Sequence, residues 1–137
     1  MSDAELQGIE QTQNCYCLAA RRYARELTRR YEAALRSHGL RATQFSVLAA
    51  LAQTGSLPIS RFAEILGLER TTLTRVAGVM KDKGWLEISV AVSDERIRYL
   101  TITKSGKNKL KAALPDWQRI QDEVDQELKR RGDEHDC

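Results

Sequence analysis

Apolar side chains recur at the helical period near both ends of the chain. Over residues 4–37 they fall in steps of three and four, with one gap bridged by a polar residue. The positions of this first stripe are Leu6, Ile9, Tyr16, Ala20, Tyr23, Leu27, Tyr31 and Ala34. A second stripe follows Thr103 and consists of Leu110, Leu114, Trp117, Ile120, Val124 and Leu128. We therefore predict a long helix at each end, over about 4–37 and 104–131, with the second kinked or divided at Pro115.

Between these stripes the pattern predicts shorter elements. Helical spacing, capping residues and β-branched runs indicate three helices and then two strands, over 44–53, 59–66, 70–83, 85–92 and 97–102. Thr43 is the expected N-cap of the first of these helices. The side chains expected to face inward on the helices are Phe45, Leu48, Leu51, Phe62, Ala63, Ile65, Leu66, Leu73, Val76, Val79 and Met80.

This order of elements predicts the fold class. It is mainly α with a small β-wing: a winged helix-turn-helix over about 43–103, flanked by the two terminal helices. With 137 residues, the chain has the length of a single domain. Neither terminal stripe can be buried against so small a body alone, so pairing with a second copy is expected. The alternative is that both stripes fold back on their own domain.

Composition adds few constraints on location and redox chemistry. No run of 18 apolar residues exists, so no membrane helix is expected, and the polar, acidic first 14 residues are unlike a secretory signal. A cytoplasmic protein is therefore expected. The three cysteines, Cys15, Cys17 and Cys137, form an odd count without metal-ligand spacing, which disfavours structural disulfides and a metal site.

The distribution of charge is more informative than the net charge of +3. Residues 60–110 contain ten basic and six acidic side chains, whereas residues 122–137 contain seven acidic and three basic ones. A basic middle and an acidic far end suit a protein that binds a polyanion through its middle.

Four short motifs occur in order along the chain and together resemble the MarR family of bacterial transcriptional regulators. They are GLRATQF at 39–45, LERTTLTR at 68–75, KGWL at 83–86, and DER at 94–96 followed by LTITKSG at 100–106. The resemblance covers nearly the whole chain and implies a homodimer, joined through the terminal helices, that binds a palindromic operator in double-stranded DNA, usually as a repressor. It also implies release from DNA by a small aromatic or anionic ligand bound between the dimerisation helices and the winged helix.

The helix expected over 70–83 is the one that would enter the DNA major groove. Arg70, Thr71, Thr72, Thr74 and Arg75 lie at its front, where threonine and arginine can contact base edges or phosphates. Ordinary capping of the helix by Thr71 or Thr72 is the alternative. Further phosphate contacts are expected from Ser60, Lys81 and Arg98.

The resemblance also assigns a role to the wing. Asp94 is expected to brace the wing while Arg96 enters the minor groove, the alternative being a solvated charge in a turn. The chain departs from the family at one point. Where members often carry an arginine after the glycine that ends the recognition helix, this chain has Ile88 and Ser89.

Two features near the start of the chain could sense a signal. Cys17 precedes Tyr31 at the spacing of the peroxide-sensing OhrR-type branch, although Arg21 stands where that branch has its second tyrosine. A nearby arginine could lower the pKa of a thiol, whereas a cysteine beside an apolar stripe is more often inert. Cys15 and Cys17, two apart on a helix, are expected to face different directions and not to bridge.

Arginines on the first helix form the second feature. Arg21, Arg25 and Arg29 recur at i, i+4, so one of them could meet the carboxylate of an anionic ligand. Alternatively they form a solvated face that pairs with Glu26, Glu32 or the acidic tail of a partner chain.

Enzyme chemistry is not expected from this inventory. The only histidines are His38 and His135, and no glycine-rich phosphate loop, metal cluster or Ser/His/Asp arrangement occurs. We expect no cofactor. A competing interpretation is a winged helix used for protein–protein contact, but the run Thr-Thr-Leu-Thr-Arg at 71–75 favours DNA over an apolar docking groove.

Overall fold

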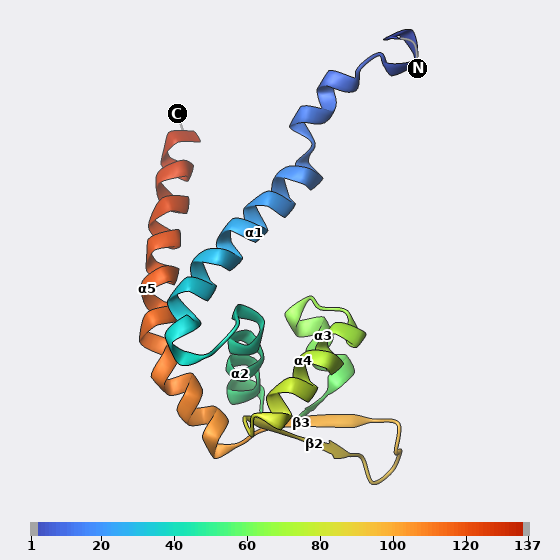
Figure 1. Ribbon diagram of the computed structural model, residues 1–137, viewed down its shortest axis with the longest axis vertical. Helices are drawn as coiled ribbons and strands as arrows, with labels where there is room; N and C mark the ends of the chain where they lie inside the picture. Colours follow the sequence, from blue (N-terminus) through green and yellow to red (C-terminus); the bar gives the residue numbers. More distant parts are fainter. Residues whose placement is uncertain (1–2, 136–137) are drawn as a thin grey trace.

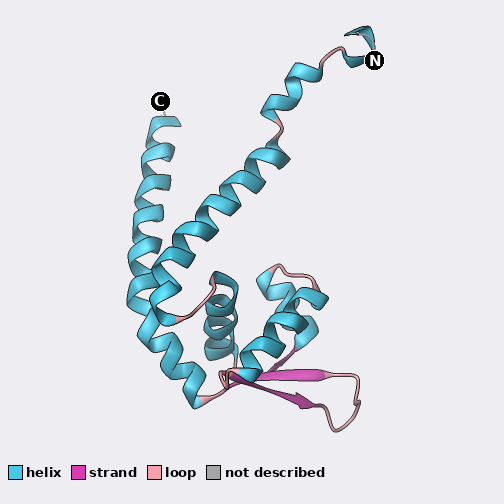
Figure 2. Ribbon diagram, viewed as in Figure 1, coloured by secondary structure: helices cyan, strands magenta, loops and turns pink. Residues whose placement is uncertain are grey.

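The computed structural model describes residues 3–135 (Figures 1 and 2). In chain order the helices and strands are η1 (Asp3–Leu6), η2 (Ile9–Asn14), α1 (Tyr16–Leu35), η3 (Arg36–His38), α2 (Ala42–Thr54), β1 (Leu57–Pro58), α3 (Ile59–Leu66), α4 (Arg70–Asp82), β2 (Leu86–Val90), β3 (Arg98–Ile102) and α5 (Lys104–His135), where η denotes a 3-10 helix. Figure 1 shows a body made of α2 to β3, from which α1 and α5 extend as two diverging arms. No helix among the described residues has the length and apolar character needed to span a membrane.

The body is a winged helix-turn-helix, as the sequence predicts. Helices α2, α3 and α4 pack against a three-stranded antiparallel sheet of order β1-β3-β2. The register pairs Ile88 with Leu100 and Val90 with Arg98. The short strand β1, whose Leu57 pairs with Leu100, is not among the predicted elements. A two-residue strand has no periodicity to detect, so only the partner strand reveals it.

Most of the predicted core is buried, but two inward assignments are wrong. On α4 the buried side chains are Leu73, Ala77 and Met80, and Val79 is exposed. On α3, Ile65 is likewise exposed. On both helices the apolar face that meets the core is narrower than the sequence suggested. On α4 the small residue Ala77 lies on that face.

The prediction of a helix starting near residue 4 is wrong. The helix α1 begins only at Tyr16, after two 3-10 turns and an extended residue, Cys15. Gly8 has φ +88°, a left-handed conformation that interrupts regular helix. None of the residues of η2 is buried, so no packing stabilises an α-helix there. The gap in the first stripe coincides with this break.

The N-terminus of α2 also differs from the prediction, because Arg41 and not Thr43 occupies the N-cap position. The backbone N–H of Arg41 donates to Gln44 Oε1 at 2.9 Å. Glu32 Oε1, on α1, accepts bonds from Ala42 N at 3.4 Å and from Arg41 Nε at 3.2 Å. The cap therefore comes partly from a different helix, which a local sequence pattern cannot reveal.

A tight joint fixes the start of α5 to the end of α4. Thr103 Oγ1 donates to the carbonyl of Gly84 at 2.6 Å and accepts from Gly106 N at 3.0 Å. Thr103 N in turn donates to the carbonyl of Trp85 at 3.1 Å. A Cβ placed on Gly106 would lie 2.1 Å from that same carbonyl oxygen, so only glycine fits here.

Helix α5 is continuous through Pro115, and it changes direction along its length (Figure 1). Proline thus kinks this helix and does not divide it. Beyond the bend α5 packs against α1, where Arg30 forms two hydrogen bonds with Glu127, at 2.8 and 3.1 Å. The outer helices nevertheless leave large apolar side chains uncovered: Tyr16 is 90% exposed and Leu128 is 50% exposed.

Candidate nucleic-acid interface

A basic hollow lies where the start of α3, the start of α4 and the wing meet. It has a volume of about 220 Å³ and is lined by Pro58, Ile59, Ser60, Arg70, Thr74, Arg96, Ile97 and Arg98. Five of these are predicted DNA contacts, contributed by three separate segments of the chain. No acidic side chain is among the lining residues. The fold therefore brings three arginines and two hydroxyl-bearing residues to one surface depression, which suits phosphate oxygens. We refer to this site as the basic hollow.

The front of α4 presents the other predicted contacts. Thr71 and Arg75 are exposed, and Thr72 is half-buried. Glu69 occupies the N-cap position of α4, so neither Thr71 nor Thr72 caps this helix. The side chain of Glu69 makes no capping hydrogen bond. Thr74 Oγ1 donates to the carbonyl of Arg70 at 2.8 Å, which leaves its oxygen free only as an acceptor. The hydroxyl of Thr71 is thus positioned at the surface beside Arg75.

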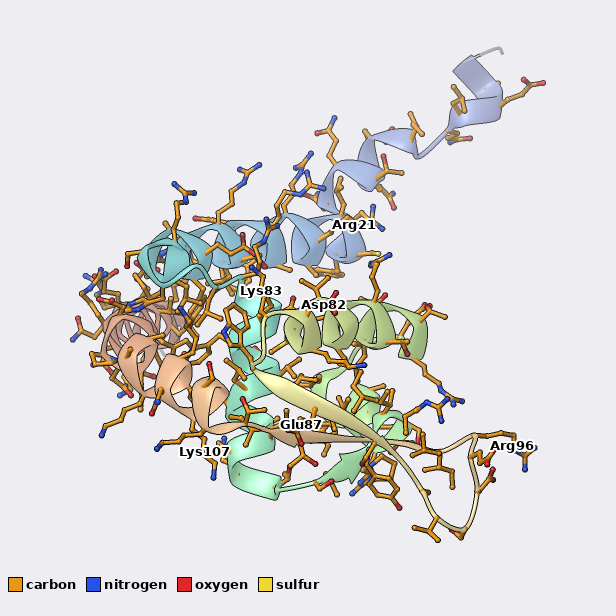
Figure 3. The ribbon with its side chains drawn as sticks, turned by 60° about the horizontal axis from the view of Figure 1, so that its bottom comes forward. Arg21, Asp82, Lys83, Glu87, Arg96 and Lys107 are labelled. Carbon is orange, nitrogen blue, oxygen red and sulfur yellow. The ribbon has the colours of Figure 1, made fainter. Side chains whose placement is uncertain are left out.

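The wing is braced at its tip by a two-residue ion pair. The carboxylate of Asp94 accepts from Arg96 N at 3.0 Å, from Nε at 3.1 Å and from a terminal guanidinium nitrogen at 3.2 Å. These bonds hold the pKa of Asp94 below its usual value. The guanidinium of Arg98 donates to the carbonyl of Glu95 and ties the base of the same turn. Arg96 itself remains exposed and points away from the body at the end of the wing (Figure 3).

Lys81 is not brought together with these residues. It lies at the other end of α4, in a separate depression with Glu87, Ile88, Ser89 and Thr103. Figure 3 shows the neighbouring Asp82 and Lys83 well separated from Arg96. The departure from the family pattern at Ile88 also has a structural reason. Ile88 is half-buried against the core, opposite Leu100, where a charged side chain would be costly to bury.

The candidate sensing residues are dispersed. Cys15 and Cys17 are exposed free thiols at the start of α1, and Cys137 lies outside the described residues. Tyr31 follows Cys17 by 14 residues, about 21 Å along the helix axis, so the two do not meet within one chain. The hydroxyl of Tyr31 instead donates to Gln121 Oε1 on α5.

Tyr31 lines a second depression, between α1, α2 and α5. Its volume is about 180 Å³, and its lining residues are Leu27, Thr28, Tyr31, Leu35, Ala42, Phe45, Ser46 and Trp117. Trp117 stacks on Phe45 with 5.5 Å between ring centroids, and burial raises the pKa of Tyr31. We refer to this site as the aromatic pocket. Phe45 was expected on the inner side of its helix and Trp117 in the apolar stripe of the last helix, and nothing in their spacing signals a pocket.

The arginines of α1 do not line the aromatic pocket. Arg21, Arg25 and Arg29 are exposed, and Arg21 projects from the first half of α1 (Figure 3). A further arginine of α1, Arg30, pairs with acids of the same chain, with Glu127 at 2.8 Å and with Glu123 at 3.6 Å. Glu32, an expected partner of these arginines, bonds Arg41 instead.

Comparisons with known proteins agree with this geometry. A family model described as the MarR family matches residues 38–97. The transcriptional regulator MosR of M. tuberculosis, solved in complex with DNA, is 39% identical; the match covers 80% of each chain with a TM-score of 0.74.

Curated relatives are more distant. The transcriptional repressor MprA of Escherichia coli (strain K12) is 31% identical over 83 residues, or 59% of this chain and 47% of MprA. The HTH-type transcriptional regulator YwaE of Bacillus subtilis is 28% identical over 90 residues, or 66% of this chain and 53% of YwaE. The chain thus matches about half the length of these curated relatives.

Proposed function

Because this chain belongs to the MarR family of transcriptional regulators, we propose that it binds operator DNA as a homodimer and regulates transcription. In this proposal it acts as a repressor that a small-molecule ligand releases from a palindromic operator. The observation that carries the proposal is the basic hollow, in which Ser60, Arg70, Thr74, Arg96 and Arg98 come together. Its neighbours on α4, Thr71, Thr72 and Arg75, supply the base-reading groups.

Two exposed apolar surfaces support pairing of the chain with a second copy. Tyr16 on α1 and Leu114 and Leu128 on α5 are uncovered, although they belong to the two long apolar stripes. In a two-fold dimer the same surface of both copies meets at one interface, so each of these residues is covered in both copies. Two winged helices related by a two-fold axis then read two half-sites, about one helical turn apart, which accounts for a palindromic operator.

The aromatic pocket supports binding of a small aromatic ligand. A dry cavity of roughly 150 Å³ accommodates benzene, so about 180 Å³ is enough for a single aromatic ring. Thr28, Tyr31 and Ser46 provide hydroxyl groups at the pocket, and Phe45 and Trp117 provide faces for stacking. Since the pocket lies between α1, α2 and α5, a ligand there contacts the outer helices and the winged helix together.

Binding to DNA is tested by fluorescence anisotropy with a labelled duplex from the region upstream of the chain's own gene. We expect tight binding that weakens with salt and a scrambled duplex that binds far more weakly. Arg75→Ala should weaken operator binding about tenfold or more, while the control Arg36→Ala, outside the interface, should not. No sequence-specific binding for the unmodified protein would overturn the proposal and favour a protein-docking role for the winged helix.

The ligand is tested by thermal denaturation with single-ring aromatic acids. A ligand that binds only the folded protein raises its melting temperature as its concentration rises. Ser46→Leu fills the mouth of the aromatic pocket and should abolish that rise without unfolding the protein, because Ser46 is exposed. An equal rise in both proteins would place the ligand elsewhere.

A thiol-based switch at Cys17 is a second candidate function. Both Cys15 and Cys17 are exposed, and Cys17 lies in the first turn of α1, where an oxidant can reach it. Arg21 follows one turn later. Organic hydroperoxide should then abolish DNA binding by the unmodified protein and leave Cys17→Ser active, with Cys15→Ser as the matched variant. Equal sensitivity of Cys17→Ser would exclude this switch.

A further inference from the structure

Three aliphatic side chains of the wing lie at the surface. Val92 is fully exposed, and Val90 and Ile97 are 47% and 36% exposed. We refer to these three residues as the wing cluster. Val90 ends β2, and Val92 and Ile97 lie in the turn that joins β2 to β3. Exposed β-branched residues on a projecting hairpin are a hazard for edge-to-edge association unless something covers them.

Pairing of two copies through the outer helices would not cover the wing cluster. Figure 1 shows the wing projecting from the side of the body opposite to the free ends of α1 and α5. The apolar residues assigned above to pairing between copies, Tyr16 and Leu128, belong to those helices. A second copy joined through them leaves the wing free, so the wing cluster needs a different partner.

The wing cluster is continuous with the basic hollow. Ile97 lines the hollow together with Arg70, Arg96 and Arg98. Val90 lies directly opposite Arg98 in the register of the two strands, and Ala91 N donates to the carbonyl of Ile97 at 3.0 Å. The same short hairpin therefore presents guanidinium groups and aliphatic groups side by side.

The charges of the wing are nearly balanced. Asp94 and Glu95 stand beside Arg96 and Arg98, and the carboxylate of Asp94 is bonded to the guanidinium of Arg96. Electrostatic attraction to phosphates is accordingly weaker here than on a wing with basic residues alone. The walls of the DNA minor groove offer another kind of surface, because they are formed by the C–H groups of the deoxyribose rings. An aliphatic side chain gains free energy by packing there.

We propose that Val92, flanked by Val90 and Ile97, packs against the sugar walls of the operator's minor groove where Arg96 enters it. This inference rests on the proposed function, since it names the part of the DNA that the wing touches. A contact between aliphatic groups and sugars displaces water and no counterions, so its contribution does not depend on salt. That property separates Val92 from the arginines that surround it.

The test measures operator affinity of Val92→Ser across a salt titration. Val92 is fully exposed, so the substitution leaves the fold intact. We expect binding to weaken about fivefold at every salt concentration, with an unchanged slope of log affinity against log salt. Arg96→Ala should behave differently and lower that slope by about one. Val92→Ile keeps the aliphatic contact and should bind as the unmodified protein does, and Ile65→Ser, an exposed aliphatic residue of α3 outside the basic hollow, is the matched control.

The outcomes separate this inference from the proposed function. If the unmodified protein binds no DNA, the proposed function itself fails. If it binds, and Val92→Ser binds with unchanged affinity or with a changed salt slope, the contact of Val92 with the minor groove is overturned. If Val92→Ser instead alters the sedimentation of the free protein while operator affinity is unchanged, the wing cluster covers a protein surface and the inference is wrong.

Discussion

The winged body and the two outer helices differ in how far their large apolar side chains are buried. From α2 to β3, large side chains such as Phe62, Leu73 and Leu100 are fully buried within one chain. On α1 and α5, comparable residues such as Tyr16 and Leu128 remain at the surface. The core of the body is complete within one chain, with Leu35 of α1 and Ala113 of α5 contributing to it, whereas the outer parts of α1 and α5 leave large apolar side chains uncovered. The stability of the body is therefore a property of the chain, and that of the outer helices depends on what covers them.

The difference also explains why the two regions use polar groups differently. At the base of the body, backbone groups are paired by a neutral side chain, as at the Thr103 joint. Along the outer helices, charged side chains add to the contacts between α1 and α5, as in the pair of Arg30 with Glu127. Such exposed pairs contribute little free energy and select which helices lie together.

The largest expected effect comes from removing the centre of the body's core. Phe62→Ala leaves a cavity under α3 and should lower the free energy of unfolding by about 4 kcal/mol, at any protein concentration. Urea denaturation at two protein concentrations measures this. The control Ile65→Ala, on the exposed side of the same helix, should cost less than about 1 kcal/mol. A loss that shrinks at high concentration would contradict the idea that the body is self-sufficient.

A smaller loss is expected at the joint between the two regions. Gly106→Ala puts a methyl group 2.1 Å from the carbonyl oxygen of Trp85 and 2.9 Å from Ile102. Backbone cannot move aside cheaply, so we expect a loss of about 3 kcal/mol in urea denaturation. The matched control is Gly132→Ala, on the same helix, where a Cβ meets nothing within 4 Å. That variant should be neutral or slightly more stable, and equal behaviour of the two variants would refute the close packing at Gly106.

A substitution on the outer helices should change the strength of pairing between copies. Leu128→Ser removes an aliphatic side chain that is half exposed in one chain, and a two-fold interface contains it twice. We expect the dissociation constant of the dimer to rise about thirtyfold, measured by sedimentation equilibrium. Val92→Ser, a more exposed aliphatic residue on the wing, should leave it unchanged. A monomeric unmodified protein would show that the stripes are not covered by a second copy.

The smallest effect concerns the ion pair between η3 and α5. The side chain of His38 lies 2.6 Å from Asp116, and this hydrogen bond lowers the pKa of Asp116. A lowered folded-state pKa contributes stability above the unfolded value, near 3.9, that is lost as pH falls through the folded value. The melting temperature of Asp116→Asn should therefore lie slightly below that of the unmodified protein at neutral pH, and the gap should narrow as pH falls below about 4 and vanish below the folded-state pKa of Asp116. Asp125→Asn, in an exposed pair with Lys129, is the control, and a gap that widens in acid would contradict the assignment.

Sequence reasoning succeeded where the relevant physics is local. The bounds of α3 were predicted correctly, and those of α4 to within one residue, because helical spacing and glycine stops act over a few positions. It failed where a distant group intervenes. Thr43 was chosen as a cap by its chemistry, whereas Glu32 on another helix assists the cap of α2. Val79 fits the apolar spacing of α4, yet only the packed core determines which face turns inward.

The candidate site shows the same limit. Arg70 and Arg96 were selected from motifs and Arg98 as a phosphate contact, but their meeting in one hollow depends on the pairing of β2 with β3 and on the position of α4. Lys81 was expected as a further phosphate contact, but it lies at the other end of α4, in a depression separate from the basic hollow. The aromatic pocket could not be predicted, since Phe45 and Trp117 are 72 positions apart and meet only through the fold.

The crowded contact between Gly106 and Trp85 has a mechanical consequence. Because there is no free space between Gly106 and Trp85, the start of α5 cannot shift relative to the end of α4, and the two rotate as one unit. Leu128 lies 22 residues beyond Gly106, about 33 Å along the helix, so a rotation of about 5° at the joint moves that end by roughly 3 Å. The long helix thus multiplies small angles. In the proposed dimer, a shift of a few ångströms where two copies meet at the far ends of α5 therefore corresponds to a rotation of only a few degrees of each winged body and of the recognition helix it carries.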